Sequence, residues 1–257
     1  MFALTQWGAV HENQFDERVA QGVRGRRPKG PELRPARVAL LLVAWMAFAG
    51  ILIGVGQLVT HSGRIQGFDN HVTSIVVAHR GPGLNVIMKA VTWLGSWVAV
   101  LAATAVIVVL VLRRTLSVGF FVLAALLWAG TQGATTLAKH VVQRPRPPES
   151  LRLVTAHGWS WPSGHTAVAV VVFDVLAMVL THFMRSRVAQ VATWTAAVVA
   201  IAAVGFSRIE LWVHWTTDVL ASVVFVSGWL GATVTLFARE LGAADDHELS
   251  TTPNLPE

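Results

Sequence analysis

Long apolar runs separated by short polar stretches dominate this 257-residue chain. Each run is about 18 residues or longer, enough for an α-helix to cross a hydrocarbon core about 30 Å thick. The runs cover residues 38–59, 90–112, 117–137, 163–183, 188–206 and 215–238. The pattern predicts an all-α polytopic membrane protein, built as a six-transmembrane-helix bundle.

The segment between the first two predicted spans, residues 68–79, is too short to cross a bilayer. Its apolar residues Val72, Ile75 and Val76 fall on one helical face. We therefore expect a short amphipathic helix that lies along the membrane interface. Residues 81–83, Gly-Pro-Gly, should end this helix before the second span.

The polar ends of the chain flank a single membrane domain. Residues 1–36 are polar and basic, lack the apolar core of a signal peptide, and are expected to form a disordered cytoplasmic tail. Residues 37–239 form the six-span domain, and residues 240–257 are expected to be a disordered acidic cytoplasmic tail. In the first span, Gly50 and Gly54 have a G-x-x-x-G spacing that favours close packing within the bundle over dimerisation, so the sequence defines no oligomeric state.

Composition agrees with a membrane protein, since 54% of the residues are hydrophobic and 13% are charged, against about 25% charged in a soluble domain. The chain has no cysteine, which excludes disulfides and thiolate metal sites. Five histidines outside the motifs below lack paired ligand spacing with a carboxylate, so we expect no metal and no cofactor. They are His61, His71, His79, His140 and His157.

The net charge of +6 is spread over loops and the amino-terminal tail, which indicates membrane topology and not nucleic-acid binding. Six spans place both termini on one side, together with Arg113, Arg114, Arg185 and Arg187. The positive-inside rule makes that side cytoplasmic, in the cell membrane. A second basic group falls on the extracytoplasmic side, against the rule, and this indicates a bound anion there. It comprises Lys139, Arg144, Arg146, Arg152 and Arg208.

The first of three polar clusters on that side contains Lys139 and Arg146, seven residues apart, with Pro147 after the arginine. A compact ammonium and a planar guanidinium that converge on one point suit a phosphate group. A basic helix edge that snorkels toward water is the structural alternative.

The second cluster opens the fourth span with Pro162 and Ser163. A helix that starts in this way leaves the backbone N–H groups of Ser163, Gly164 and His165 free to bind an oxyanion. His165 is also placed to give a proton to a leaving group. The alternative is a capped helix with a hydrogen-bonded histidine.

The third cluster contains His214 and Asp218, which are four residues apart at the start of the sixth span. On a helix these side chains share a face, so the carboxylate can orient the imidazole of a nucleophilic or basic histidine. A helix cap or a surface polar pair has the same spacing. Arg208 adds a guanidinium. All three clusters fall at one membrane face, which argues against three independent structural explanations.

Taken in order, the K-x6-R-P, P-S-G-H and S-R-x5-H-x3-D patterns resemble the three signature motifs of the type 2 phosphatidic acid phosphatase (PAP2) family, membrane relatives of vanadium haloperoxidases. The resemblance covers about residues 69–238 and implies metal-independent hydrolysis of a lipid phosphate or pyrophosphate. It casts His214 as the nucleophile that forms a phosphohistidine, Asp218 as its orienter and His165 as the acid. The groups that would bind the phosphoryl oxygens are Lys139, Arg146, Ser163, Gly164 and Arg208.

The lipid substrate is less well defined. A polyprenyl pyrophosphate such as undecaprenyl pyrophosphate is favoured, because an outward site fits recycling of a cell-envelope carrier, while phosphatidylglycerol phosphate and phosphatidic acid stay open. A lipid phosphotransferase and a non-catalytic lipid phosphate carrier or flippase are the alternative functions. The chain has Glu210, Trp212 and Thr216 where the family commonly has an aromatic residue, Gly and Pro. We expect Trp212 to narrow the pocket and Glu210 to disfavour multiply charged head groups.

One further polar residue, Asp174, falls eleven residues into the fourth predicted span. At about 1.5 Å per residue it lies about 16 Å below the helix start, where an ionised carboxylate is unfavourable. We expect it to face the bundle interior and to take a hydrogen bond from another span. The candidate partners by depth are Thr104, Thr131, Gln132, Thr135 and Thr193.

Overall fold

A computed structural model describes residues 35–250, apart from the side chains of Arg37 and of residues 237–250. This part of the chain contains helices and no strand, which confirms the all-α class. The helices are α2 (Pro35–His61), α3 (Gly63–Ala78), α4 (Pro82–Val91), α5 (Trp97–Leu112), α6 (Val118–Val142), α7 (Gly164–His182), α8 (Arg187–Glu210) and α9 (Thr216–Ser250), with 3-10 turns at Thr92–Gly95 and Glu149–Leu151.

Five of these helices are long and apolar enough to cross a membrane, namely α2, α6, α7, α8 and α9. A sixth span results if α4 and α5 are taken together, with a bend of 47° between them. The six-span prediction is therefore confirmed in number, but the continuous second span is wrong. The apolar pattern alone does not reveal the bend, because both halves are apolar.

Local contacts explain where this span is broken. The hydroxyl of Ser96 accepts a hydrogen bond from the backbone N–H of Val98 (3.3 Å) and so caps a new helix, α5. Immediately before it, Gly95 lies against the start of α7, where a Cβ on Gly95 would be 2.5 Å from the carbonyl oxygen of His165. The break thus occurs where the chain packs against the start of the fourth span.

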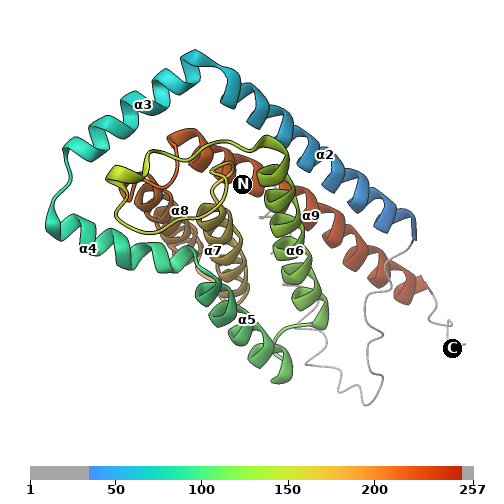
Figure 1. Cartoon of the computed structure of the whole chain (residues 1–257). Coiled ribbons are helices and arrows are strands. Elements are labelled where there is room, and N and C mark those ends of the chain that lie inside the picture. The colour runs from blue at the N-terminus through green and yellow to red at the C-terminus, as the bar shows by residue number, and fades with distance from the viewer. Residues whose placement is uncertain (1–34, 251–257) are drawn as a thin grey trace, which may run out of the picture.

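Helix α3 is the expected short helix between the first two spans, and it is not long and apolar enough to cross the membrane. Figure 1 shows α3 leading away from the end of α2 and connecting it to α4 outside the bundle. The Ser62 hydroxyl caps α3 at the N–H of Ile65 (3.4 Å). Most of α3 is exposed or half-buried, whereas Asp69 and Thr73 are buried.

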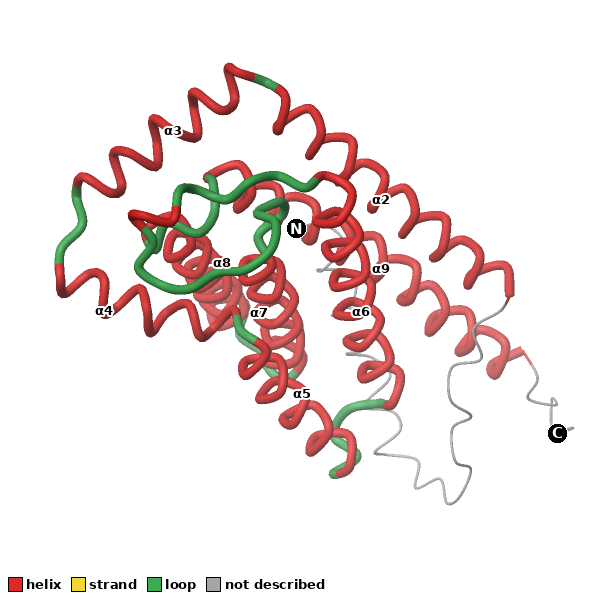
Figure 2. Tube along the Cα trace, viewed as in Figure 1, coloured by secondary structure: helices red, strands yellow, loops and turns green. Residues whose placement is uncertain are grey.

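Helix α7 is the centre of the bundle, since it packs against α5, α6, α8 and α9. Helix α2 packs on α6 and α9 and leaves an apolar outer face that includes Leu42, Val43 and Met46 exposed. Figure 2 shows that the loops after α6 and after α8 gather at one end of the bundle. That end brings together the termini of α6 and α8 and the beginnings of α7 and α9.

The prediction that Gly50 and Gly54 allow close helix packing in the first span is wrong. Gly50 and Gly54 have no atom within 4 Å of an added Cβ, because the face they share points away from the other helices. The close approach on α2 is at Gly56 instead, where an added Cβ would be 2.4 Å from Nε1 of Trp161. The same Nε1 donates a hydrogen bond to the Leu52 carbonyl (3.1 Å), so α2 packs directly on the loop that precedes α7.

The last helix extends past the predicted end of the sixth span. Helix α9 continues to Ser250, and the expected disorder of the acidic tail, residues 240–257, stays a prediction. Ala, Leu and Glu in this stretch are good helix formers, and the first proline is Pro253. The predictions for residues 1–34 and 251–257 lie outside the described residues.

Asp174 is buried in α7, as expected, but it forms no hydrogen bond with any residue that the structure describes. Two proposed donors bond to their own helices: the Thr135 hydroxyl to the Gln132 carbonyl (3.2 Å) and the Thr193 hydroxyl to the Ala189 carbonyl (2.9 Å). The buried Thr131 hydroxyl also has no partner among the described groups. Equal depth in the membrane therefore did not bring these groups together.

Candidate active site

His214 lies in the short connection between α8 and α9, and its side chain is buried. The backbone N–H groups of Val213 and His214 both donate to the Arg208 carbonyl (3.2 Å each), which folds the connection back onto the end of α8. Trp212 has a φ of 61°, a left-handed conformation that favours glycine. This turn points the imidazole into the end of the bundle.

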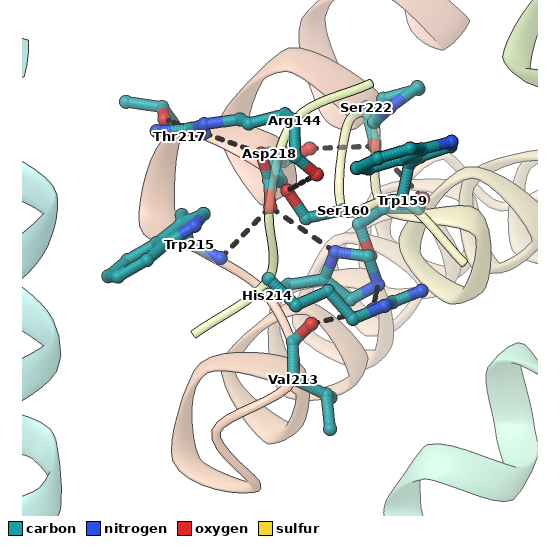
Figure 3. A network of polar contacts seen from close by, with 12 residues as sticks. Arg144, Trp159, Ser160, Val213, His214, Trp215, Thr217, Asp218 and Ser222 are labelled. Carbon is teal, nitrogen blue, oxygen red and sulfur yellow. Dashed lines mark hydrogen bonds and ion pairs between the residues drawn. The ribbon is translucent and has the colours of Figure 1, made fainter. Parts of the chain in front are cut away.

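The predicted pair of His214 and Asp218 is in hydrogen-bond contact. His214 Nδ1 lies 3.3 Å from Asp218 Oδ2, and the Trp215 backbone N–H donates to the same oxygen (3.0 Å). Because a carboxylate only accepts, Nδ1 carries the ring proton and Nε2 keeps its lone pair. Figure 3 shows the Asp218 carboxylate next to the imidazole and Trp215.

Arg146 faces the other ring nitrogen. Its Nη1 lies 3.0 Å from His214 Nε2 and donates to the Val213 carbonyl (2.6 Å). Its remaining donors bind the Gly158 carbonyl (Nε, 2.9 Å) and the His157 carbonyl (Nη2, 3.1 Å). Burial lowers the pKa of the Arg146 guanidinium, and the nearby charge of Asp218 opposes that shift. Arg146 thus joins the loop before α7 to the nucleophile candidate.

Lys139 lies in the last turn of α6, which continues to Val142. Its Nζ donates to the carbonyls of Trp159 (3.0 Å) and Pro162 (2.7 Å), so the ammonium holds the loop that leads into α7. These carbonyl contacts keep a positive charge at the helix start where an anion would bind.

The start of α7 agrees with the prediction only in part. Ser163 caps the helix, and its hydroxyl accepts from the N–H of Thr166 (3.4 Å) and contacts the Thr166 hydroxyl (2.9 Å). Its backbone N–H donates to the Asp218 carbonyl (3.2 Å) and is therefore not free for an oxyanion, in contrast to our expectation. Beside Gly164 there is open space, since an added Cβ would have no atom within 4 Å.

Arg208 is buried in the last turn of α8, and its Nη1 donates to the Thr92 hydroxyl. Its Nε is buried without a partner among the described residues. His165 is half-buried at the start of α7. Both groups lie close enough to act electrostatically on His214, together with Arg146 and Lys139.

Burial, followed by these charges, lowers the pKa of His214 well below its usual value. The imidazole is therefore neutral near pH 7, as a nucleophile must be. The fold thus brings the cations and His165, which come from three separate stretches of sequence, together around His214. A site with this excess of positive charge suits a phosphate anion.

Two residues in the site were not predicted. Arg144 bonds Asp218 Oδ1 (2.5 Å) and Asp69 Oδ2 (2.6 Å), and all three side chains are buried. Arg144 was counted among the basic residues without a role, although its position two residues before Arg146 was a usable signal. Asp69 gave no signal in the sequence, because only the fold brings α3 to this place.

Glu210 is paired with other groups of the protein. Its buried carboxylate pairs with Arg80 Nε (3.8 Å), and the Asn85 amide donates to Oε1 (2.6 Å) in the orientation that satisfies both amide atoms. The Arg80 guanidinium lies 5.7 Å from the centre of the Trp212 ring and donates to the Leu151 carbonyl (3.0 Å). Because Arg80 balances the charge of Glu210, we no longer expect this carboxylate to repel the head group.

Comparison with known proteins agrees with this geometry. The family model "PAP2 superfamily" matches residues 117–241. Phosphatidylglycerophosphatase B of Bacillus subtilis (strain 168) is 30% identical over 164 residues, which cover 62% of this chain and 78% of that protein.

Two solved structures share the fold. The crystal structure of the first transmembrane PAP2 type phosphatidylglycerolphosphate phosphatase from Bacillus subtilis matches with a TM-score of 0.62 and 27% identity, over 79% of this chain and 96% of that chain. The crystal structure of Aquifex aeolicus LpxE matches with a TM-score of 0.50 and 21% identity, over 67% and 93% of the two chains. The motifs, the fold and the Bacillus relative agree, and the chain belongs to the PAP2 superfamily of membrane phosphatases.

Proposed function

We propose that this enzyme hydrolyses a lipid phosphate or pyrophosphate through a phosphohistidine on His214, without a metal ion. One observation carries the proposal: the His214 imidazole is held by Asp218 at Nδ1 while Nε2 faces Arg146. With the ring proton on Nδ1, Nε2 keeps a lone pair for attack on phosphorus and lies beside a cation that can bind the phosphoryl oxygens.

In the first step, Nε2 of His214 forms a bond to phosphorus while the bond from phosphorus to the leaving oxygen breaks. His165 gives a proton to that oxygen. In the second step, water attacks the phosphohistidine, His165 accepts a proton from the water, and the P–N bond breaks to release inorganic phosphate. Arg146 Nη1 must exchange its contact with Nε2 for a phosphoryl oxygen before attack.

Charge stabilisation comes from the chain itself. Lys139, Arg146 and Arg208 provide three cations near His214, and the start of α7 adds backbone N–H groups and its helix dipole. We propose that these groups replace the metal ions that many phosphoryl-transfer enzymes use. Activity should therefore persist in excess chelator.

The substrate class is proposed from the relatives and from the site. The Bacillus relatives are named for the hydrolysis of phosphatidylglycerol phosphate, which makes that lipid the first candidate here. A polyprenyl pyrophosphate such as undecaprenyl pyrophosphate is the second, on the argument from an outward site, and phosphatidic acid is the third. A phosphate-release assay over these three lipids, in chelator, ranks them by kcat/KM.

The same assay separates the alternative functions. A non-catalytic lipid phosphate carrier or flippase would release no phosphate from any lipid in the panel. A lipid phosphotransferase would consume the substrate but transfer the phosphoryl group to an acceptor, so inorganic phosphate would fall short of substrate loss. Equal amounts of the two products support the hydrolase.

For orientation, we propose that both termini are cytoplasmic and that the site faces the extracytoplasmic side of the cell membrane. Arg113, Arg114, Arg185 and Arg187 lie at bundle ends opposite to the site, and the positive-inside rule supports this orientation. The chain has no cysteine, so single cysteines can be introduced directly. An impermeant maleimide should label E149C in intact cells and T115C only after permeabilisation, and the reverse pattern would overturn the orientation.

A further inference from the structure

Arg144 lies between two buried carboxylates at the base of the site. Its Nη2 binds Asp69 Oδ2 (2.6 Å) on α3, and its Nη1 binds Asp218 Oδ1 (2.5 Å) on α9. Thr217 closes the arrangement, because its backbone N–H donates to Asp69 Oδ1 (2.9 Å) and its hydroxyl to Asp69 Oδ2 (2.6 Å). We call Asp69, Arg144 and Asp218 the buried charge trio.

The trio controls how the Asp218 carboxylate is turned. Oδ1 is bound by Arg144, which leaves Oδ2 for His214 Nδ1 and the Trp215 N–H. Figure 3 shows Arg144 and His214 on different sides of this carboxylate. Arg144 is itself fixed, since the Ser160 N–H donates to its carbonyl (2.9 Å). Rotation of Asp218 away from the imidazole would break its bond with Arg144.

The trio also sets the charge beside His214. Arg144 and Asp218 alone would neutralise each other, and the carboxylate would then do little to stabilise positive charge on the imidazole ring. The second carboxylate, Asp69, makes the net charge minus one. A buried cation with two carboxylate partners also avoids the penalty of an unpaired buried charge.

We propose that Asp69 and Arg144 are positioning residues of this enzyme, which hold Asp218 toward His214 and keep the net charge beside the imidazole at minus one. The proposal rests on the proposed function, because it takes His214 as the nucleophile. It also gives α3, the helix outside the bundle, a direct connection to the reaction.

Other charged or titratable groups surround His214 and must stay constant in any test. They are Lys139 on α6, His165 on α7, Arg208 on α8 and Arg146 in the loop before α7. Substitution of Asp69 or Arg144 leaves all of these in place. A shift in the pH dependence of kcat/KM can then be assigned to the trio.

The test compares D69N, R144Q and the double variant D69N/R144Q with the wild type. The measurements are kcat, KM, the rate of phosphoenzyme formation, and the pH at which the acid limb of kcat/KM is half-maximal. D69N changes the net charge of the trio from minus one to zero. Protonation of His214 then becomes less favourable, so the acid limb moves to lower pH. R144Q changes it to minus two and moves the limb to higher pH, and the double variant restores minus one.

Each single shift should be about one pH unit, the effect of a unit charge roughly 10 Å away at an effective dielectric constant of about 20. We expect kcat to fall about tenfold in both single variants with KM changed less than twofold. The double variant should return the acid limb to within about 0.3 unit of the wild type. E149Q, which removes a carboxylate from an ion pair with Arg152 in which the Glu149 side chain is 86% exposed, is the matched control and should shift nothing.

A conservative variant separates charge from geometry and covers the case in which R144Q does not fold. R144K keeps the charge but loses the fork that reaches both carboxylates, so its acid limb should match the wild type while kcat stays low. The proposal would be overturned if the acid limbs of D69N and R144Q moved in the same direction. It would also be overturned if the acid limb of D69N did not move and R144K were fully active. If wild type forms no phosphoenzyme and H214A stays active, the nucleophile assignment itself has failed, which is a separate result.

Discussion

Replacement of Gly95 by Ala should disturb the site from a distance, because the added methyl group meets the backbone of the residue that we assign as the acid. The new Cβ would lie 2.5 Å from the His165 carbonyl oxygen and 2.7 Å from Cγ1 of Val204. An ordinary contact begins at 3.4 Å, so the start of α7 must move by 3.4 − 2.5 = 0.9 Å unless the 3-10 turn yields.

Overpacking of this kind lowers the free energy of unfolding by about 1–3 kcal/mol. A displacement of about 1 Å at a reacting group can reduce the rate about 100-fold. We therefore expect G95A to lose most of its kcat, with a melting temperature in detergent that falls by several degrees. The assays are phosphate release from the preferred lipid and thermal unfolding of the purified protein.

The matched control is G83A, on the neighbouring helix α4, where an added Cβ has no atom within 4 Å. It makes the same chemical change in open space and should leave both measurements as in wild type. If G95A is as stable and as active as G83A, the contact between the 3-10 turn and α7 does not position His165, and the reasoning is refuted.

Three further predictions concern single groups. H165A should slow hydrolysis of a lipid phosphate monoester at least about tenfold more than hydrolysis of p-nitrophenyl phosphate, whose leaving group needs little protonation. Equal losses of activity on the two substrates would contradict the acid role. Because the folded-state pKa of His214 lies below its unfolded value, the unfolded chain takes up a proton first as the pH falls. The contribution of this residue to stability should thus be complete above about pH 6.5 and decrease below it, a trend that H214A should lack in melting experiments over pH. Asp174 has no hydrogen-bond partner among the described residues, so D174L should keep its activity and melt no lower than wild type, whereas a clear drop in melting temperature would reveal a partner.

The apolar runs were sufficient to predict the bundle, since length and hydropathy decide whether a helix can cross a membrane. They could not reveal the bend between α4 and α5, which occurs where Gly95 packs against His165, a residue far from it in the sequence. For the same reason the G-x-x-x-G pattern misplaced the close helix contact. Small residues permit a close approach, but only the packing decides whether it occurs at Gly54 or at Gly56.

The site was predictable to the extent that its chemistry is local. His214 and Asp218 are four residues apart on one turn, and the spacing alone predicted their contact. The hydrogen bond from the Ser163 N–H to the Asp218 carbonyl and the ion pair of Arg144 with Asp69 join residues from segments far apart in the sequence. Residue spacing within one segment cannot predict such contacts, because they depend on how the segments pack in the folded protein.

The central claim, a phosphohistidine on His214, is tested most directly by trapping the intermediate. Wild-type enzyme mixed with radiolabelled lipid phosphate in excess chelator and quenched in alkali should carry an acid-labile, alkali-stable label, and peptide mapping should place it on His214. H214A should carry no label and lose at least about a thousandfold in kcat while it elutes and melts as a folded protein. Label on another residue, or an H214A variant that retains more than about a thousandth of the wild-type activity, would contradict the account.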